Sequence, residues 1–597
     1  MRDLLSLRQT LEDVAEVDLF LAERLCAWLH CDEDWLFYSL VGVSHALRQG
    51  HSCLLLSAWA GRTEWAVDDQ PDSGYRFPAL DDWHARLSSL PIGPDEDAPV
   101  VYEHQRLYLR RYWRFECDLA EGLRLRLDAP TQPNLKAARE ALATLFDLGG
   151  NHTDWQAVAA ANALFNRFSI IAGGPGTGKT YTVTRVLALL AMTLPDAPTI
   201  RMAAPTGKAA QRLGESIRAA KSDLGGRVDL VTLDAIPDEA TTLHRLLGVI
   251  PNQPGFRHDA RNPLDIDILL MDEVSMVDLP LMARLFRTLP AHCRVILLGD
   301  ADQLPSVAAG SVLADLAERP HPGYSPTRTK ALKQFGFTVD ASGKNPGPAD
   351  YLSYLYHSRR FDGEGGIGRL ARQVIEGDAD GSLNTLIAGH NDLEWVPTER
   401  IQNRISRWVE DWYRPIAHSL DRAAAFDALF QFRLLCPTRV GPLGVEALNE
   451  RILKMLNPGR APFFKGQPIM ITENHYGVGL YNGDIGLIWP DDEGQLLAWF
   501  QTGEEHRPVA PGRLPRFETV YAMTIHKTQG SEFERVAIIL PETPMAMLSR
   551  ELIYTGLTRA RQSLAIAGSE PVWRDGVKRR VERFSGLQKR LVGDQRN

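Results

Sequence analysis

The feature that most constrains the fold of this chain is the glycine-rich stretch GGPGTGKT at residues 173–180. It follows a short β-branched run, residues 168–172, and precedes an apolar stretch typical of a helix from about Thr180. This order of strand, loop and helix is the setting in which the pattern G-x-x-x-x-G-K-[ST] forms a phosphate-binding loop. Glycines let backbone N–H groups converge on phosphate oxygens, and the helix N-terminus favours anions. The sequence therefore predicts a phosphate loop in an α/β fold.

The residues of this loop divide into two groups by their expected roles. Lys179 is expected to reach the β- and γ-phosphates of ATP, and Thr180 to ligate Mg²⁺ through its hydroxyl. The remaining residues are expected to bind phosphate through the backbone: Gly173, Gly174, Pro175, Gly176, Thr177 and Gly178. ATP and Mg²⁺ are therefore the predicted cofactors.

Two further apolar runs end in polar residues, as buried parallel strands do where ligands bind in open α/β sheets. Residues 266–271 lead into Asp272 and Glu273. We expect Asp272 to assist in holding Mg²⁺ and Glu273 to orient the attacking water as a base. Residues 295–298 lead toward Gln303, whose amide can report whether the γ-phosphate is present. These side chains complete the predicted site of hydrolysis.

Composition limits the classes of protein to which the chain can belong. Its 597 residues suffice for three or four domains. No apolar run reaches about 18 residues, and acids interrupt the opening stretch, so we expect a cytoplasmic protein without a membrane segment. The six cysteines form no C-x-x-C pair, which favours reduced, buried thiols over a metal site. The net charge of −9 gives no global sign of nucleic-acid binding, although a narrow channel needs only local positive charge.

Eight stretches along the chain resemble, in order and spacing, the motifs of superfamily 1 helicases. They are DWQAVAAANAL, RMAAPTGKAAQRL, TTLHRLLG, MDEVSM, GDADQLPSV, HSRRF, YAMTIHKTQGSEF and YTGLTRARQ. The resemblance implies that Gln156 reads the adenine edge and that Glu532 contacts the ribose. It also implies that Arg360 and Arg559 act as arginine fingers, supplied across a cleft by a second core. The 380 positions between Lys179 and Arg559 (559 − 179) fit that two-core arrangement.

More narrowly, four pieces of the chain together resemble the RecD family, the α subunits of exodeoxyribonuclease V, or RecBCD complex. The pieces are TLHRLLG, LYNGDIGL, IHKTQGSEF and TGLTRAR, and the N-terminal GHSCLLLS and RLYLRRYW resemble that family's own N-terminal domain. The resemblance implies an ATP-dependent DNA helicase and translocase that moves 5′ to 3′ and processes double-strand ends in recombinational repair. It further implies RecB-like and RecC-like partner subunits, with any nuclease activity belonging to a partner.

DNA is the expected substrate, both as single strands and as duplex with ends. Hydroxyls and short cations suit phosphate contacts that do not depend on base sequence. The candidate DNA-binding residues lie in stretches that resemble strand-binding motifs: Thr206, Lys208, Thr242, His244, His526 and Thr528.

The fold class expected from these stretches is α/β, with two RecA-like phosphate-loop cores, a small β-barrel insert in the second core and a mixed α/β N-terminal domain. Short alternating strands with turn signals favour the insert, and the family resemblance implies that it is SH3-like. The predicted limits are 1–150 for the N-terminal partner-contact domain, 151–345 for the first core, 346–456 and 519–597 for the two parts of the second core, and 457–518 for the insert. Residues 318–350, rich in proline, are predicted to form a loop or a partly disordered excursion.

Three alternatives remain open at this point. A free-standing RecD-like helicase would carry the same motifs, but those relatives have a longer N-terminal extension with paired-helix DNA-binding motifs that this chain lacks. A nucleotide switch without motor activity would show ATP hydrolysis that does not depend on DNA. A structural subunit would need no intact site, whereas Lys179, Asp272, Glu273, Gln303 and Arg559 are all present.

Overall fold

A six-stranded parallel sheet carries the predicted phosphate loop, and we call the part of the chain built around it the first core. The computed structural model describes residues 3–67, 70, 73–129, 131–148, 153–250, 253, 255–342, 348–358, 360, 365–475, 477–502 and 505–592. The strand order is β11-β6-β10-β9-β7-β8, and every neighbouring pair is parallel. The strands are β6 (Phe168–Gly173), β7 (Ile200–Ala204), β8 (Thr241–Thr242), β9 (Ile268–Met271), β10 (Arg294–Gly299) and β11 (Leu352–Leu355). The three strands expected from the apolar runs are thus confirmed as β6, β9 and β10.

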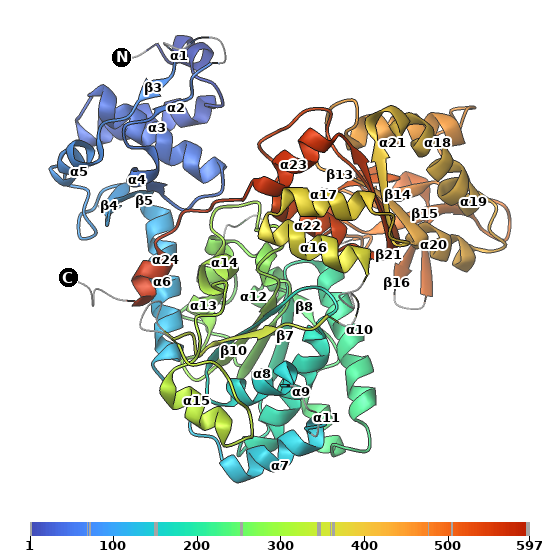
Figure 1. Ribbon diagram of the computed structural model, residues 1–597, viewed down its shortest axis with the longest axis horizontal. Coiled ribbons are helices and arrows are strands. Elements are labelled where there is room, and N and C mark those ends of the chain that lie inside the picture. Colours follow the sequence, from blue (N-terminus) through green and yellow to red (C-terminus); the bar gives the residue numbers. More distant parts are fainter. Residues whose placement is uncertain are drawn as a thin grey trace.

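Helices cover both faces of this sheet (Figure 1). One face packs against α7 (Leu135–Leu145), α8 (Trp155–Leu164), α9 (Lys179–Thr193) and α10 (Gly207–Leu224). The other packs against α6 (Arg110–Leu127), α12 (Leu243–Leu247), α13 (Leu279–Thr288) and α14 (Val312–Leu316). Within β9, Ile268 and Leu270 face the first set while Leu269 and Met271 face the second. A strand buried on both faces reads as a continuous apolar run, because successive side chains alternate between the faces.

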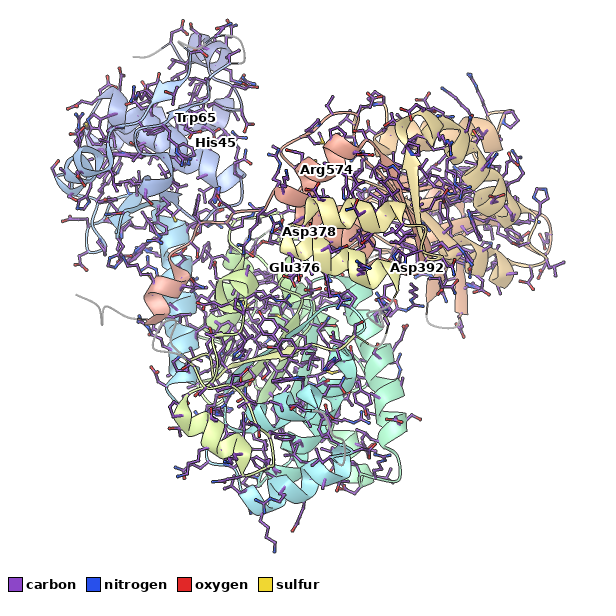
Figure 2. All side chains as sticks on the ribbon, in the orientation of Figure 1. His45, Trp65, Glu376, Asp378, Asp392 and Arg574 are labelled. Atoms are coloured by element: carbon purple, nitrogen blue, oxygen red, sulfur yellow. The ribbon has the colours of Figure 1, made fainter. Side chains whose placement is uncertain are left out.

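A second parallel sheet, in the order β12-β21-β20-β13-β19, forms what we call the second core. Its strands are β12 (Leu393–Pro397), β13 (Phe432–Cys436), β19 (Ala522–Thr524), β20 (Phe533–Ile539) and β21 (Ala560–Gly568). One face packs against α16 (Gly366–Glu376), α17 (Ala379–Ile387), α22 (Arg550–Leu557) and α23 (Glu570–Lys578), and the other against α18 (Ile401–Trp408), α20 (Arg422–Gln431) and α21 (Val445–Leu456). Asp392 caps α16 by accepting hydrogen bonds from the amides of Gly366 and Ile367 (Figure 2).

A five-stranded antiparallel sheet interrupts the second core between α21 and β19. Its order is β17-β16-β15-β14-β18. The strands are β14 (Pro468–Ile471), β15 (Ile485–Pro490), β16 (Leu496–Thr502), β17 (Glu505–Val509) and β18 (Phe517–Thr519). Ile469, Ile488 and Phe500 contribute to a small apolar cluster of its own. Antiparallel strands therefore occupy the stretch in which an insert was predicted, while its SH3-like character stays a prediction.

The N-terminal part lies apart from both sheets at the upper left of Figure 1. It combines α1 (Leu4–Thr10), α2 (Glu16–Leu29), α3 (Asp34–Arg48), α4 (Leu56–Trp59) and α5 (Leu80–Ser88) with a three-stranded sheet of β1 (Leu54–Leu55), β5 (Arg106–Leu109) and β4 (Val100–Glu103), and with the pair β2 (Thr63–Glu64) and β3 (Tyr75–Arg76). His45 and Trp65 meet edge to face in its aromatic cluster (Figure 2). Helix α6 leaves this part and runs onto the first core, against which its apolar face packs.

Residues 318–350 contain more structure than the expected loop. Helix α15 (Pro326–Lys333) begins at a proline, and the hydroxyl of Ser325 caps it by accepting from the amide of Arg328. Leu332 and Phe335 are buried in the same cluster as α7 and α8. Proline at the first position of a helix costs no hydrogen bond, so a proline that suggested a loop instead starts a helix. Residues 343–347 lie outside the described residues.

The segment that follows α23 returns from the second core to the N-terminal part (Figure 1). There the amide of Phe584 donates to His51 Nδ1, and the ring of Phe584 stacks on the imidazole of His51. A final helix, α24 (Leu587–Val592), packs on α6. We call residues 584–588 the return segment, because it touches parts of the chain that lie far from it in sequence. In the part of the chain that the structure describes, no helix has the length and apolar character needed to cross a membrane.

Candidate active site

The phosphate loop closes tightly between β6 and α9. Gly176 and Gly178 have φ angles of 76° and 79°, in the left-handed region that favours glycine. A Cβ on Gly176 would lie 2.4 Å from the Cβ of Arg360, so a side chain there has no room. Helix α9 begins at Lys179 with Gly178 as its N-cap, which leaves the first backbone amides of a 15-residue helix without helical partners. The loop therefore has the shape and the donors that a chain of phosphates requires.

The lysine and the glutamine of the site both hydrogen-bond the loop itself. Lys179 Nζ donates to the carbonyl oxygens of Gly173 at 2.7 Å and Gly174 at 3.1 Å. Gln156 Nε2 donates to the carbonyl of Thr177 at 2.9 Å. Both side chains thus lie where a bound nucleotide would meet them, and both can exchange a loop carbonyl for a ligand atom.

The two acids lie at the carboxyl end of β9, as expected from the sequence. The amide of Glu273 donates to Asp272 Oδ1 at 2.8 Å, and Glu273 itself has a φ of 52°. The pKa of Asp272 is raised to about 6, mainly by burial and also by the neighbouring Glu273, while Lys179 opposes the shift. A carboxylate at the end of a strand and the hydroxyl of the loop threonine are ligands that Mg²⁺ takes at phosphate loops, so Asp272 and Thr180 have the chemistry to hold that ion.

Gln303 lies after β10 and is held by its neighbour. Its Nε2 donates to Asp300 Oδ2 at 3.2 Å, and the residue is 6% exposed. Its Oε1 is buried and has no hydrogen-bond partner among the described residues. A buried acceptor left open in this way suits a ligand atom or a water molecule.

The two expected arginine fingers lie in different parts of the structure, Arg360 after a strand of the first core's sheet and Arg559 in the second core. Arg360 comes from the segment between β11 and α16, next to Ser358, whose hydroxyl donates to the loop carbonyl of Pro175 at 2.8 Å. Its neighbour Arg359 lies outside the described residues. Arg559 lies in the turn between α22, which ends at Leu557, and β21, which begins at Ala560 and pairs with β20.

The guanidinium of Arg559 is buried and faces its own core. Its Nε donates to the carbonyl of Thr555 at 2.9 Å and its Nη1 to that of Ser531 at 3.2 Å. Burial lowers the pKa of Arg559, whereas the carboxylates of Glu273 and Glu532 raise it. The influence of Glu273 places this arginine within electrostatic range of the first core's acids.

Glu532 forms ion pairs with three arginines from three parts of the chain. Its carboxylate pairs with Arg212 of α10 at 3.1 Å, with Arg360 at 2.9 Å and with Arg561 of β21 at 3.0 Å. Burial raises the pKa of this carboxyl, but the three guanidinium groups outweigh burial and hold the pKa at about 2. In this structure the expected ribose contact is therefore an ionic junction between the two cores.

The candidate DNA-binding residues have different surroundings. Thr206 and Thr242 are N-caps, each accepting from a backbone amide at 3.2 Å, of α10 and α12. His244 is exposed, while Thr528 is fully buried and donates to the carbonyl of Ile525 at 2.7 Å. The hydroxyl of Thr528 therefore faces the protein interior rather than a strand.

Lys208 and His526 are the candidates whose pKa the surroundings lower. The pKa of Lys208 is lowered to about 8, mainly by burial and also by the nearby guanidinium groups of Arg212 and Arg433, while Asp484 opposes the shift. Burial also lowers the pKa of His526. Lys208 is thus a cation whose charge depends on its surroundings.

Four contacts around the site were not expected from the sequence. They involve Ser358, Arg212, Arg561 and Tyr554. Tyr554 and Arg561 lie within the stretch YTGLTRARQ, so the motif itself was a signal for their neighbourhood. Their partners are more than twenty-five positions away along the chain, which no local pattern reveals.

Family models match three regions of the chain. The AAA domain matches residues 156–309 and the UvrD-like helicase C-terminal domain matches residues 519–567. The N-terminal domain of the RecBCD enzyme subunit RecD matches residues 12–108. The RecBCD enzyme subunit RecD of Mycobacterium tuberculosis is 37% identical over 595 residues, which cover 96% of this chain and 94% of that protein. The chain belongs to the RecD family.

Other members of the RecD family support this assignment. The RecBCD enzyme subunit RecD of Haemophilus influenzae is 36% identical over 86% of this chain and 85% of its own length. The ATP-dependent RecD2 DNA helicase of Deinococcus radiodurans is 31% identical over 81% of this chain, which spans 58% of that longer protein. The expected resemblance to the RecD family is confirmed. The match to an AAA domain also supports nucleotide binding at the phosphate loop.

Proposed function

We propose that this chain is an ATP-dependent DNA helicase and translocase, the 5′ to 3′ motor subunit of a RecBCD-type helicase–nuclease that processes double-strand ends in recombinational repair. In this proposal the chain assembles with RecB-like and RecC-like subunits, one of which supplies any nuclease activity. Its substrates are single-stranded DNA and duplex DNA with ends. The two parallel sheets are RecA-like cores, and the antiparallel sheet is an SH3-like insert.

The observation that carries the proposal is that the two cores meet beside the phosphate loop, through the ion pair of Arg212 with Glu532 and the hydrogen bond from Tyr554 to Asp300. The first core supplies Lys179, Asp272 and Glu273 at the carboxyl ends of its strands. The second core supplies Arg559, which follows α22, the helix whose Tyr554 donates to Asp300 of the first core at 2.9 Å. A nucleotide switch can work with the residues of the first core alone, whereas a site that needs both cores couples hydrolysis to their relative position.

The residues of the cleft have distinct proposed roles in turnover. Lys179 and the loop amides bind the phosphates, and Glu273 accepts a proton from the attacking water. Arg360 and Arg559 leave their present partners and approach the γ-phosphate, closing the cleft. When bound, Mg²⁺ on Thr180 and Asp272 neutralises charge on the phosphate oxygens. Release of the phosphate removes the anion that held the arginines, so the cores separate again.

The subunit role is favoured over that of a free-standing helicase by the extent of the similarity. This chain spans 94% of the RecBCD enzyme subunit RecD of Mycobacterium tuberculosis but 58% of the longer RecD2 helicase of Deinococcus radiodurans. The N-terminal domain of the RecBCD enzyme subunit RecD also matches residues 12–108 of this chain. We therefore infer a motor that works within an assembly.

The rate of ATP hydrolysis, measured with and without single-stranded DNA, tests the proposal. We expect strong stimulation by DNA, either by the chain alone or after it is purified with its partner subunits from the native host. Hydrolysis should vanish in Lys179→Gln, which keeps the fold because the lysine bonds to loop carbonyls rather than to a core partner. A rate of ATP hydrolysis that is the same with and without DNA in both preparations would favour a nucleotide switch instead.

A further inference from the structure

The loop that follows β10 is tied to the second core at two adjacent residues of α22. The hydroxyl of Tyr554 donates to Asp300 Oδ2 at 2.9 Å. The hydroxyl of Thr555 accepts from the amide of Leu304 at 2.8 Å. On the same side, Gln529 Nε2 donates to the carbonyl of Leu304 at 3.1 Å. A movement of the second core would therefore displace this loop through these hydrogen bonds.

Tyr554 also touches the phosphate loop. A Cβ on Gly174 would lie 3.0 Å from its hydroxyl oxygen, and Tyr554 is 4% exposed. Burial raises the pKa of Tyr554 well above its ordinary value, and the carboxylates of Asp300 and Asp302 raise it further. The phenol therefore stays protonated and acts as a permanent donor to Asp300.

Asp300 in turn holds the amide of Gln303. Its Oδ2 accepts both the Tyr554 hydroxyl and Gln303 Nε2, while its Oδ1 accepts the amide of Asp302 at 3.1 Å. The carboxylate is 1% exposed, so it depends on these donors for the hydrogen bonds that water would otherwise provide. With Nε2 committed to Asp300, the unpaired Oε1 of Gln303 is the atom that remains to accept a hydrogen bond.

We propose that Tyr554 is a positioning residue for hydrolysis, acting through Asp300 to hold Gln303 with its Oε1 directed at the attacking water. This inference rests on the proposed function and deepens it. An acceptor that orients the water is a known requirement of phosphoryl transfer to water. Because the donor belongs to the second core, Gln303 reaches this orientation when α22 is docked on the first core. The chain thereby makes hydrolysis depend on closure through a hydrogen bond as well as through arginine charge.

The test is the variant Tyr554→Phe, which removes one hydroxyl and keeps the ring. In the full chain we expect kcat for DNA-stimulated ATP hydrolysis to fall about tenfold, the size of one lost hydrogen bond to a charged group. The KM for ATP and the thermal midpoint should stay close to those of the unaltered chain. Tyr413→Phe is the matched control, because its buried hydroxyl donates to the carbonyl of Tyr521 inside the second core, away from the nucleotide.

A double variant separates positioning from a general structural effect. Gln303→Ala alone should lower kcat at least as much as Tyr554→Phe, and adding Tyr554→Phe to it should cause no further loss, because Tyr554 acts through Gln303. Losses that multiply in the double variant, or turnover in Tyr554→Phe equal to that of the unaltered chain, would overturn the inference. Absence of DNA-stimulated hydrolysis in the unaltered chain and its assembly would instead count against the proposed function.

Discussion

At the scale of single residues, the position of Arg559 shows how the cleft is built. Its guanidinium is buried, yet it donates to carbonyls of Thr555 and Ser531 in its own core. Two neutral acceptors satisfy a cation less well than a phosphate does, so a γ-phosphate can draw the guanidinium across the cleft. The present partners of Arg559 therefore bind it more weakly than a γ-phosphate would.

The variant Arg559→Ala should keep nucleotide binding and lose turnover. We expect kcat to fall by about 10³-fold or more, as when an arginine finger is removed from a related phosphoryl-transfer site. Binding of a fluorescent ATP analogue and single-turnover hydrolysis would measure the two properties separately. Arg404→Ala, which removes an arginine that pairs with Glu394 of the edge strand β12, serves as the control. Normal turnover in Arg559→Ala would remove the argument for two cooperating cores.

The junction at Glu532 should contribute to stability above its ordinary pKa. The pKa is lowered to about 2 in the folded protein, so the stabilisation is complete above an unfolded value near 4.5 and is lost as pH falls toward 2. Glu532→Gln should therefore lower the thermal midpoint by several degrees at pH 7. The difference from the unaltered chain should shrink as the pH is lowered below 4.5.

Differential scanning calorimetry at several pH values measures this effect. Glu534→Gln is the control, because Glu534 pairs with Arg561 alone, at 3.3 Å, and has a more exposed side chain. Equal midpoints for Glu532→Gln and Glu534→Gln at pH 7 would show that the three-arginine junction does not stabilise the fold.

Residues that lie close together along the chain were the predictable part of the site. The loop from Gly173 to Thr180 and the pair Asp272 and Glu273 follow from runs of a few residues, because the strand before them fixes where they point. The bond from Tyr554 to Asp300 spans 254 positions and depends on how two cores dock. No periodicity in the sequence reports such a contact, so its partners emerge from the structure alone.

At the scale of elements, α10 links the nucleotide to the expected path of the DNA. Thr206 caps its start, Lys208 lies in its first turn, and Arg212, one turn later, pairs with Glu532. Lys208 and Arg212, the arginine that pairs with Glu532, therefore lie on the same helix.

Binding of single-stranded DNA should weaken as pH rises through the lowered pKa of Lys208. With a pKa of about 8, Lys208 is mostly charged at pH 7 and mostly neutral at pH 9. Loss of one phosphate contact should reduce affinity about fivefold over that interval at low salt. Lys208→Arg, which stays charged, should bind with nearly constant affinity. Fluorescence anisotropy with a labelled oligonucleotide makes the comparison, and equal pH dependence in both proteins would exclude Lys208 as the phosphate contact.

Elements buried on both faces were easier to predict than those at edges. Strands β9 and β10 appear as continuous apolar runs because helices cover both sides. Strand β12 lies at the edge of its sheet and has the sequence LEWVP. Its charged residue and its proline interrupt the apolar pattern by which a strand is predicted. Helix α15 was missed for a related reason, since Pro326 starts the helix rather than ending it.

At the scale of the whole molecule, the buried carboxylate of Glu116 joins three distant parts of the chain. It accepts from the Ser52 hydroxyl at 2.5 Å, from the Gly586 amide at 3.0 Å and from Arg590 Nε at 3.3 Å. Asp315 of α14 holds the same return segment through the hydroxyl of Ser585 at 2.8 Å. The N-terminal part is thereby fixed to the first core through residues that follow the second.

Glu116→Ala should loosen the N-terminal part without changing hydrolysis. Removing a buried charge that satisfies several donors costs about 3–5 kcal/mol, so the thermal midpoint should fall and protease should release the N-terminal part sooner. The ATPase rate should stay the same, because Glu116 lies outside the cleft. Glu121→Ala, an exposed glutamate on the same helix, is the control. Unchanged protease resistance in Glu116→Ala would contradict the idea that Glu116 fixes the N-terminal part to the first core.

The return segment also sets the order in which the molecule can be completed during translation. Gly586 follows Glu116 by 470 positions. At about 5–20 residues per second, a ribosome needs roughly 25 to 90 seconds to travel that distance. Throughout this time Glu116 has left the exit tunnel without its last partners, and its charge stays in water. The N-terminal part can fold early on the nascent chain, but its attachment to the first core waits until the return segment has been made.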